Sequence, residues 1–226
     1  MTITPRLLIR AAGSCAVLAG MLFVLIQFIH SHEDVASVTT TAWTLTHVLT
    51  LVMAGLALVG ITGMYLRQVT AAGLLGLVGY LLFAACFLLL VAGTWVEAFV
   101  LPPVADAAPQ FVDDVVAIPA GGTVVGDVGY LDTGGQVLGV TYLLGGLLFG
   151  TALFRAAVLA RWAALALTFG IVLTLLLPFL PHTLGRMTAV PVGLGLAGLG
   201  ISLWRESPGS RRPGVSSPNS MTVGAQ

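Results

Sequence analysis

Two residue types in this 226-residue sequence are suited to ligand or metal binding, and both recur at one predicted membrane boundary. Imidazole and carboxylate side chains bind zinc, copper and iron, and two facing imidazoles can hold a haem. Four such side chains are expected at similar depth on four different helices: His30, His47, Glu97 and His182. They are the candidate metal or haem ligands of this sequence.

A plain interfacial role competes with this interpretation. Polar side chains collect at a membrane boundary because water begins there, and the spacing of these residues matches no known ligand motif. His47 is the strongest candidate, since it lies about one turn inside the end of its helix, below Trp43, and there needs a partner. If its helix packs antiparallel to the next one, Glu97 reaches the same depth. The carboxylate would then orient the imidazole at a metal site or form a structural ion pair.

The elements that must position these side chains are membrane helices. The sequence is 58% hydrophobic and 8% charged, whereas soluble domains carry about 25% charged residues. Six apolar runs carry charges only near their ends, and each is long enough to cross about 30 Å of hydrocarbon. They cover residues 8–29, 42–66, 71–96, 135–156, 162–180 and 187–204. We therefore expect an all-α bundle of six transmembrane helices over residues 1–204, followed by a disordered cytoplasmic tail over 205–226, which is rich in Ser, Pro, Gly and Arg.

A long acidic segment over residues 97–134 separates the first three runs from the last three. It contains six of the nine acidic residues: Glu97, Asp106, Asp113, Asp114, Asp127 and Asp132. Within it, the pattern over 109–117 predicts a short helix on the membrane surface, with its valines on one side and Asp113 and Asp114 on the other. The segment is too polar for a bilayer and is predicted to be an outer loop.

Arginine is distributed unevenly between the two sides of the predicted bundle. If the N-terminus is inside, eight of the nine basic residues are cytoplasmic, and only Arg186 is outside. The eight are Arg6, Arg10, Arg67, Arg155, Arg161, Arg205, Arg211 and Arg212. By the positive-inside rule, this predicts a multi-pass plasma-membrane protein with both termini in the cytoplasm.

Two patterns bear on assembly. Three helices on each side of the outer loop suggest a 3+3 inverted repeat, and residues 18–23 resemble residues 144–149. Gly135 and Gly139, like Gly146 and Gly150, have the spacing that lets helices approach closely. These glycines serve packing within one bundle or a contact with a second copy or another membrane protein.

The function expected from these observations is non-enzymatic. The sequence contains no Gly-rich phosphate loop, no nucleophile with its base and no helical zinc-protease motif. The net charge is zero, so nucleic acid is not an expected partner, and the lipid bilayer is. We favour the interpretation that the protein is an accessory subunit or another component of a membrane-protein assembly. The first alternative is a metal- or haem-binding redox or sensor protein that uses His47 with His30, His182 or Glu97. The second is a small-solute transporter, although no ionisable group lies near the predicted midplane.

Overall fold

The computed structural model describes residues 3–30, 33–119, 121–180 and 182–205, and their regular structure is entirely helical. Five helical segments are long and apolar enough to cross a membrane. They are α1 (Pro5–Ile29), α3 (Thr41–Arg67), α4 (Val69–Phe99), α7 (Leu131–Ala156) and Gly185–Arg205, which includes α10 (Val190–Arg205). The predicted all-α membrane fold is confirmed to this extent. The predicted tail lies, from residue 206 on, outside the described residues.

The first of the two C-terminal runs changes its helix type near its outer end. The run over 162–180 is α-helical only in α8 (Arg161–Leu173) and continues as the 3-10 helix η1 (Thr174–Phe179). A proline at position 178 removes a backbone donor, so an α-helix cannot continue undisturbed through it. Together α8 and η1 cover residues 161–179, which nearly matches the predicted run over 162–180. α9 (His182–Met187) ends where the next predicted run, 187–204, begins, and α10 covers most of that run, with Pro191 in its first turn.

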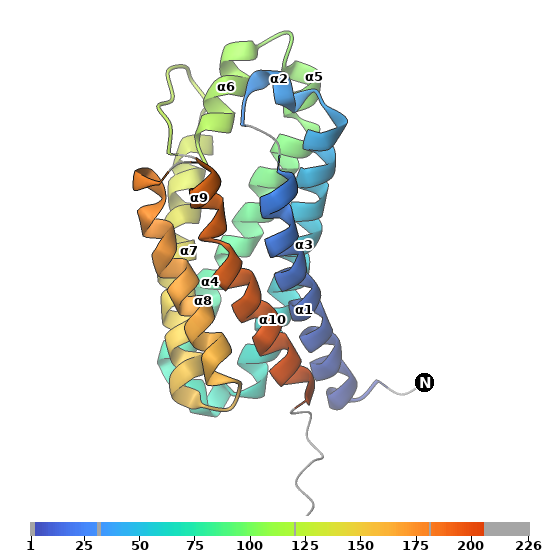
Figure 1. Cartoon of the computed structure of the whole chain (residues 1–226), viewed down its shortest axis with the longest axis vertical. Coiled ribbons are helices and arrows are strands. Elements are labelled where there is room, and N and C mark those ends of the chain that lie inside the picture. The colour runs from blue at the N-terminus through green and yellow to red at the C-terminus, as the bar shows by residue number, and fades with distance from the viewer. Residues whose placement is uncertain (1–2, 31–32, 120, 181, 206–226) are drawn as a thin grey trace, which may run out of the picture.

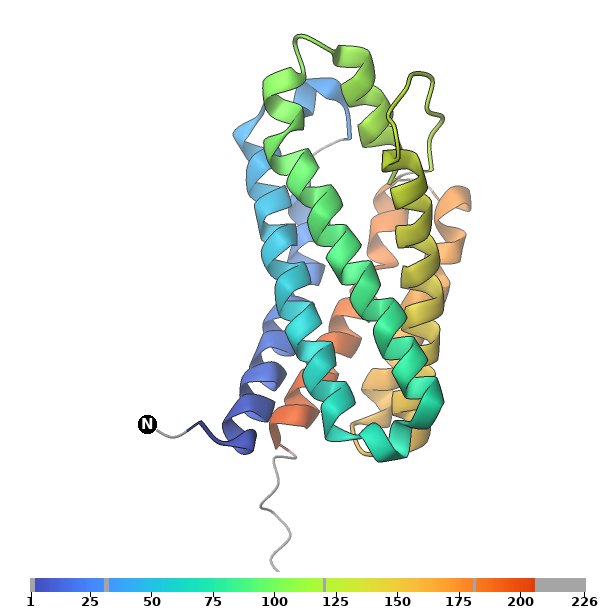
Figure 2. The same ribbon diagram turned by 180° about the vertical axis from the view of Figure 1, so that it is seen from behind.

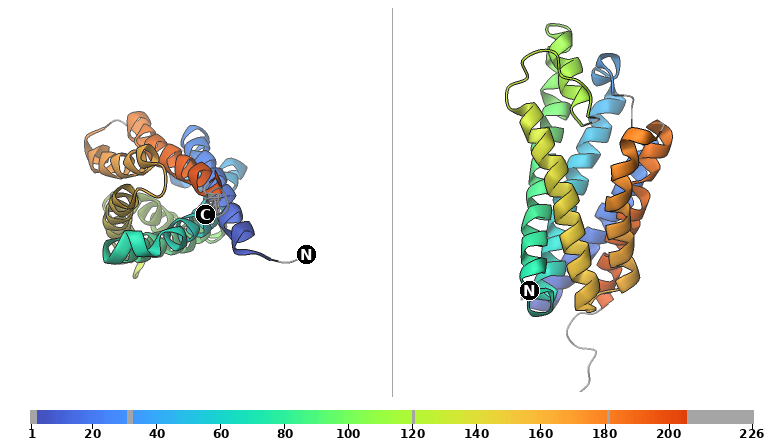
Figure 3. Two further views of the ribbon diagram at one scale, coloured as in Figure 1. Left: turned by 90° about the horizontal axis from the view of Figure 1, so that it is seen from below. Right: turned by 90° about the vertical axis from the view of Figure 1, so that its left-hand side faces the viewer.

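The long helices form a ring in chain order. α3 packs between α1 and α4, α7 between α4 and α8, and α10 between α8 and α1. Seen from below, the helices surround a common centre (Figure 3). The N-terminal end of α1 and the C-terminal end of α10 lie together at the lower end (Figure 1). The centre is filled by large buried side chains, among them Ile61, Phe83, Phe149 and Leu196.

Glycines bring two pairs of helices into backbone contact. On α1, a Cβ atom at Gly20 would collide with the backbone of α10 at Gly193 and Ala197. On α7, a Cβ atom at Gly145 would lie 2.5 Å from the backbone nitrogen of Phe83 on α4. Two further glycines of α7 meet side chains of α8: Gly146 faces Ile171, and Gly150 faces Thr168. These glycines thus serve packing within the chain, while Gly139 faces open space.

The acidic segment folds into a cap over the upper end of the ring. It contains α5 (Leu101–Val104) and α6 (Pro109–Ala117), and α2 (Val35–Val38) packs beside α6. The predicted short helix over 109–117 is present, but its surroundings differ from those predicted. Asp114 is buried and accepts hydrogen bonds from the backbone N–H groups of Val125 and Gly126, at 2.9 and 2.8 Å. The valines of α6 pack in a second apolar cluster with Trp43 and Leu101, so α6 lies on protein.

Candidate functional site

His47 lies near the upper end of α3 and is held by its own helix. Thr40 caps this helix by accepting the N–H of Trp43 at 3.2 Å. One turn on, Nδ1 of His47 lies 2.8 Å from the carbonyl oxygen of Trp43, and the two rings stack with centroids 4.0 Å apart. A carbonyl only accepts, so Nδ1 carries the proton and Nε2 is directed elsewhere. Only 4% of His47 is exposed.

Glu97 comes from the antiparallel neighbour α4 and meets His47. Its Oε2 lies 3.5 Å from His47 Nε2. The indole N–H of Trp43 donates to the backbone carbonyl of Glu97 at 2.8 Å, so α3 and α4 are joined at this level by a second contact. The approach that antiparallel packing predicts for His47 and Glu97 is therefore observed.

His30 joins the cluster from the end of α1. Its ring meets the ring of His47 edge to face, with centroids 5.3 Å apart. Its Nδ1 lies 3.0 Å from Nη2 of Arg186, which belongs to α9. A guanidinium only donates, so His30 Nδ1 accepts here. The same Nη2 atom lies 3.5 Å from Oε1 of Glu33.

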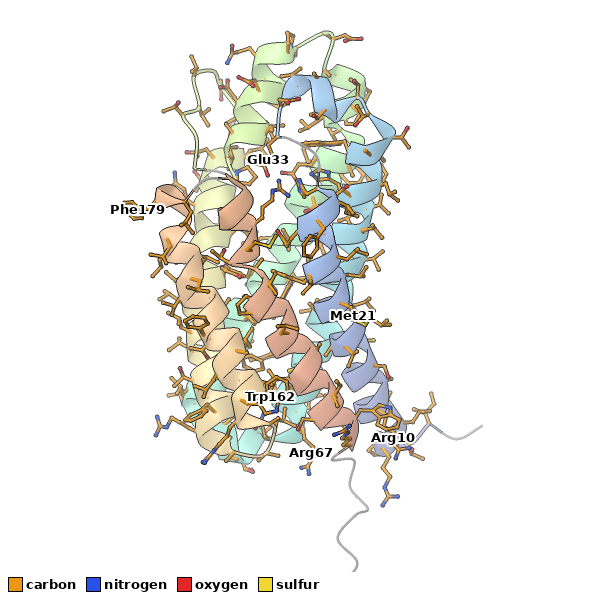
Figure 4. The ribbon with its side chains drawn as sticks, viewed as in Figure 1. Arg10, Met21, Glu33, Arg67, Trp162 and Phe179 are labelled. Carbon is orange, nitrogen blue, oxygen red and sulfur yellow. The ribbon has the colours of Figure 1, made fainter. Side chains whose placement is uncertain are left out.

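Arg186 and Glu33 are site residues that were not among the sequence candidates. Arg186 carried one signal, since it is the single arginine on the outer side of the predicted topology. A charge that departs from the positive-inside pattern is retained more readily when a carboxylate and an imidazole surround it. Glu33 carried no comparable signal, because it follows His30 in what reads as an ordinary polar loop. In Figure 4, Glu33 lies at the upper end of the bundle, far from Arg10 and Arg67 at the lower end.

The structure thus brings together three of the four sequence candidates: His30, His47 and Glu97. The fourth, His182, begins α9, and its side chain lies outside the described residues. Within the described part of the chain, no group of three or more His, Cys, Asp and Glu side chains is placed to hold a metal ion. The edge-to-face contact between His30 and His47 also differs from the opposed arrangement of two haem ligands.

A cavity of about 370 Å³ lies against this cluster, between α3, α4 and α7 and beneath α6. This volume falls in the range of small-molecule pockets, about 300–1,000 Å³. The polar wall contains His30, Glu33, His47, Thr50 and Glu97. The apolar wall includes Leu89, Leu90, Val96, Val116 and Leu138. The arrangement therefore pairs a compact hydrogen-bonding end with a larger apolar end.

A comparison of the chain with protein-family models, with curated proteins and with solved structures finds no match.

Proposed function

We propose that this chain is a non-enzymatic, six-span membrane protein that binds a small molecule in the cavity beside His47 and Glu97. The observation that carries the proposal is the position of this pair. Both side chains are largely buried, and they line a cavity whose other walls are mainly apolar. Burying ionisable groups among membrane helices is costly, and such groups usually serve function. A purely structural pair needs no empty volume next to it.

The length of α8 and η1 supports a sixth span. The 13 residues of α8 extend about 20 Å, and the six residues of η1 extend about 12 Å. Together they match a hydrocarbon thickness of about 30 Å. We propose that this segment crosses the membrane beside α7 and α10, against which α8 packs.

The proposed orientation places the cavity outside and both termini in the cytoplasm of a plasma membrane. The arginine asymmetry supports it. Exposed tryptophans also lie near both ends of the molecule: Trp95 on the cavity side, Trp162 and Trp204 on the other. Tryptophan is enriched at both membrane interfaces, so these residues suit the two boundaries.

A 3+3 inverted repeat remains part of the proposal. A repeat that relates α1 to α7 and α10 to α4 would interchange the α1–α10 and α4–α7 contacts. Both are contacts in which glycines bring backbones together, at Gly20 and Gly193 in one and at Gly79 and Gly145 in the other. This likeness supports the repeat, and the ring order of the helices is compatible with it.

Mass spectrometry of organic extracts tests the binding function. Full-length protein purified from its own host membranes is compared with Leu138→Trp, which fills the apolar end of the cavity without removing a polar group. Leu144→Trp, at an exposed position on the same helix, is the matched control. We expect a compound enriched in the wild type and in Leu144→Trp and lost from Leu138→Trp. Equal extracts from all three folded proteins would contradict the proposal.

Elemental analysis of the same samples examines the metal alternative. A stoichiometric metal that is lost in His47→Ala, together with unchanged organic extracts, would favour a metal-binding protein over the function proposed here.

A further inference from the structure

We infer that the ligand is a lipid-soluble molecule with a neutral hydroxyl head, and that it reaches the cavity from the bilayer through a slit between α4 and α7. The inference rests on the binding function proposed above. It adds the chemical class of the ligand and its route.

The slit follows from a change in packing along the α4–α7 contact. In its lower part the two backbones touch, at Gly79 beside Phe149 and at Gly145 beside Phe83. Higher up, α4 and α7 diverge, as seen from behind in Figure 2. There Gly93 of α4 and Gly134 of α7 both line the cavity, and a Cβ atom at either position would meet nothing within 4 Å.

Both helices beside the slit carry exposed apolar residues. Ala92 and Trp95 are exposed on α4, and Val137 and Val140 are exposed on α7. Trp95 lies within one turn of Gly93. Because tryptophan is enriched at membrane interfaces, this places the slit near the interface. A molecule that approaches between these residues therefore comes from lipid.

The polar end of the cavity suits a group that both donates and accepts a hydrogen bond. The Nδ1 proton of His47 is engaged by Trp43, so Nε2 is the nitrogen that faces Glu97. When the pair holds one proton between them, one partner is a donor and the other an acceptor. Their separation of 3.5 Å is longer than the roughly 2.7–2.9 Å of a close charge-assisted hydrogen bond. A hydroxyl beside the pair can accept from one partner and donate to the other. A carbonyl could only accept, and an ammonium could only donate.

The charges around the cavity are already matched, which argues for a neutral head. The guanidinium of Arg186 lies against Glu33, and Glu97 lies against His47. An anionic head would have to displace Glu33 from Arg186, and a cationic head would compete with His47 for Glu97. A hydroxyl disturbs neither pair.

Photo-labelling in phospholipid vesicles tests both parts. The probe is a C16 primary alcohol with a diazirine in mid-chain, added to vesicles that contain the full-length protein. We expect labels on α4 and α7 near Leu90 and Leu138, located by peptide mass spectrometry. The matching methyl ether, amine and carboxylic acid should label these residues at least tenfold less.

Two slit variants and one control examine the route. Gly93→Leu and Gly134→Leu obstruct the slit from opposite sides and should slow labelling at least tenfold. Gly139→Leu, also at an open position on α7 but outside the cavity, should label at the wild-type rate. Thermal unfolding of each variant shows that the comparison concerns folded protein.

The possible outcomes distinguish a failure of the proposed ligand class or route from a failure of the proposed binding function. If no probe labels the cavity and Leu138→Trp changes no extract, the proposed binding function is overturned. If the alcohol labels the cavity and the slit variants react at the wild-type rate, the lipid route is wrong, while binding stands. If the amine or the acid labels as well as the alcohol, the hydroxyl assignment is wrong.

Discussion

His47 Nε2 lies 3.5 Å from Glu97 Oε2, across the junction between α3 and α4. His47 is nearly inaccessible, and the side chain of Glu97 is 18% exposed. Each group is thus the other's polar partner in a place that water scarcely reaches. A structural pair and a metal site predict different effects when one member of the pair is removed.

Removing one member of the pair should destabilise the protein. His47→Ala or Glu97→Gln leaves the other group buried with a poorer partner, which costs about 3–5 kcal/mol at well-buried pairs and less here, because Glu97 is partly exposed. Thermal unfolding in detergent should show lower midpoints for both variants. The double variant His47→Leu with Glu97→Leu should recover part of the loss, because no unpaired group remains. Unchanged midpoints with a loss of bound metal would instead indicate ligation.

Asp114 should make the cap sensitive to acid. The N–H groups of Val125 and Gly126 hold the pKa of its carboxyl below the usual range, because they stabilise the charged form. The folded pKa is therefore the lower one. The stabilisation is complete above the unfolded value of about 3.9 and is lost as the pH falls through the folded pKa.

Hydrogen exchange of the amides of Val125 and Gly126 measures this effect. At pH 7, Asp114→Asn should exchange both amides faster than the wild type, and the difference should shrink as the wild-type carboxyl is protonated in acid. Asp113→Asn is the matched control, since Asp113 is the exposed neighbour on the same helix. Equal protection in Asp114→Asn at pH 7 would show that the carboxylate does not hold the segment.

Gly20→Ala should destabilise the α1–α10 contact. The new methyl group meets the backbone of Gly193 and Ala197, which cannot rotate away. Overpacking of this kind costs about 1–3 kcal/mol. Gly139→Ala faces open space and should be neutral or stabilising by about 0.5–1 kcal/mol, because alanine favours a helix interior over glycine. Thermal unfolding of the two variants gives the comparison, and equal midpoints would contradict the packing of these two helices.

Cysteine accessibility tests the proposed orientation. Single cysteines replace Ala107, in the cap, and Ser216, beyond the described residues, in a chain whose Cys15 and Cys86 are replaced. A membrane-impermeant maleimide added to intact cells should modify position 107 and leave position 216 unmodified until the cells are broken. The reverse pattern would place the cavity in the cytoplasm.

The sequence by itself determined the helices and the depth of the polar groups. In lipid, a segment must satisfy its backbone hydrogen bonds internally, so a long apolar run can only be a helix. The short connection between α3 and α4 makes them antiparallel, and His47 and Glu97 then fall at one level. The common depth of His47 and Glu97 can therefore be predicted from local features alone: the length of each apolar run, the length of the turn and the position of each residue along its run.

Only the tertiary structure decided what surrounds that pair. Arg186 meets His30 and Glu33 because α9 and α10 return to α1 and close the ring. Asp114 is buried because the glycine-rich segment after α6 folds back over it. The cavity exists because α4 and α7 touch below and diverge above. Each of these depends on how helices rotate and tilt against one another, and packing between distant residues sets those angles.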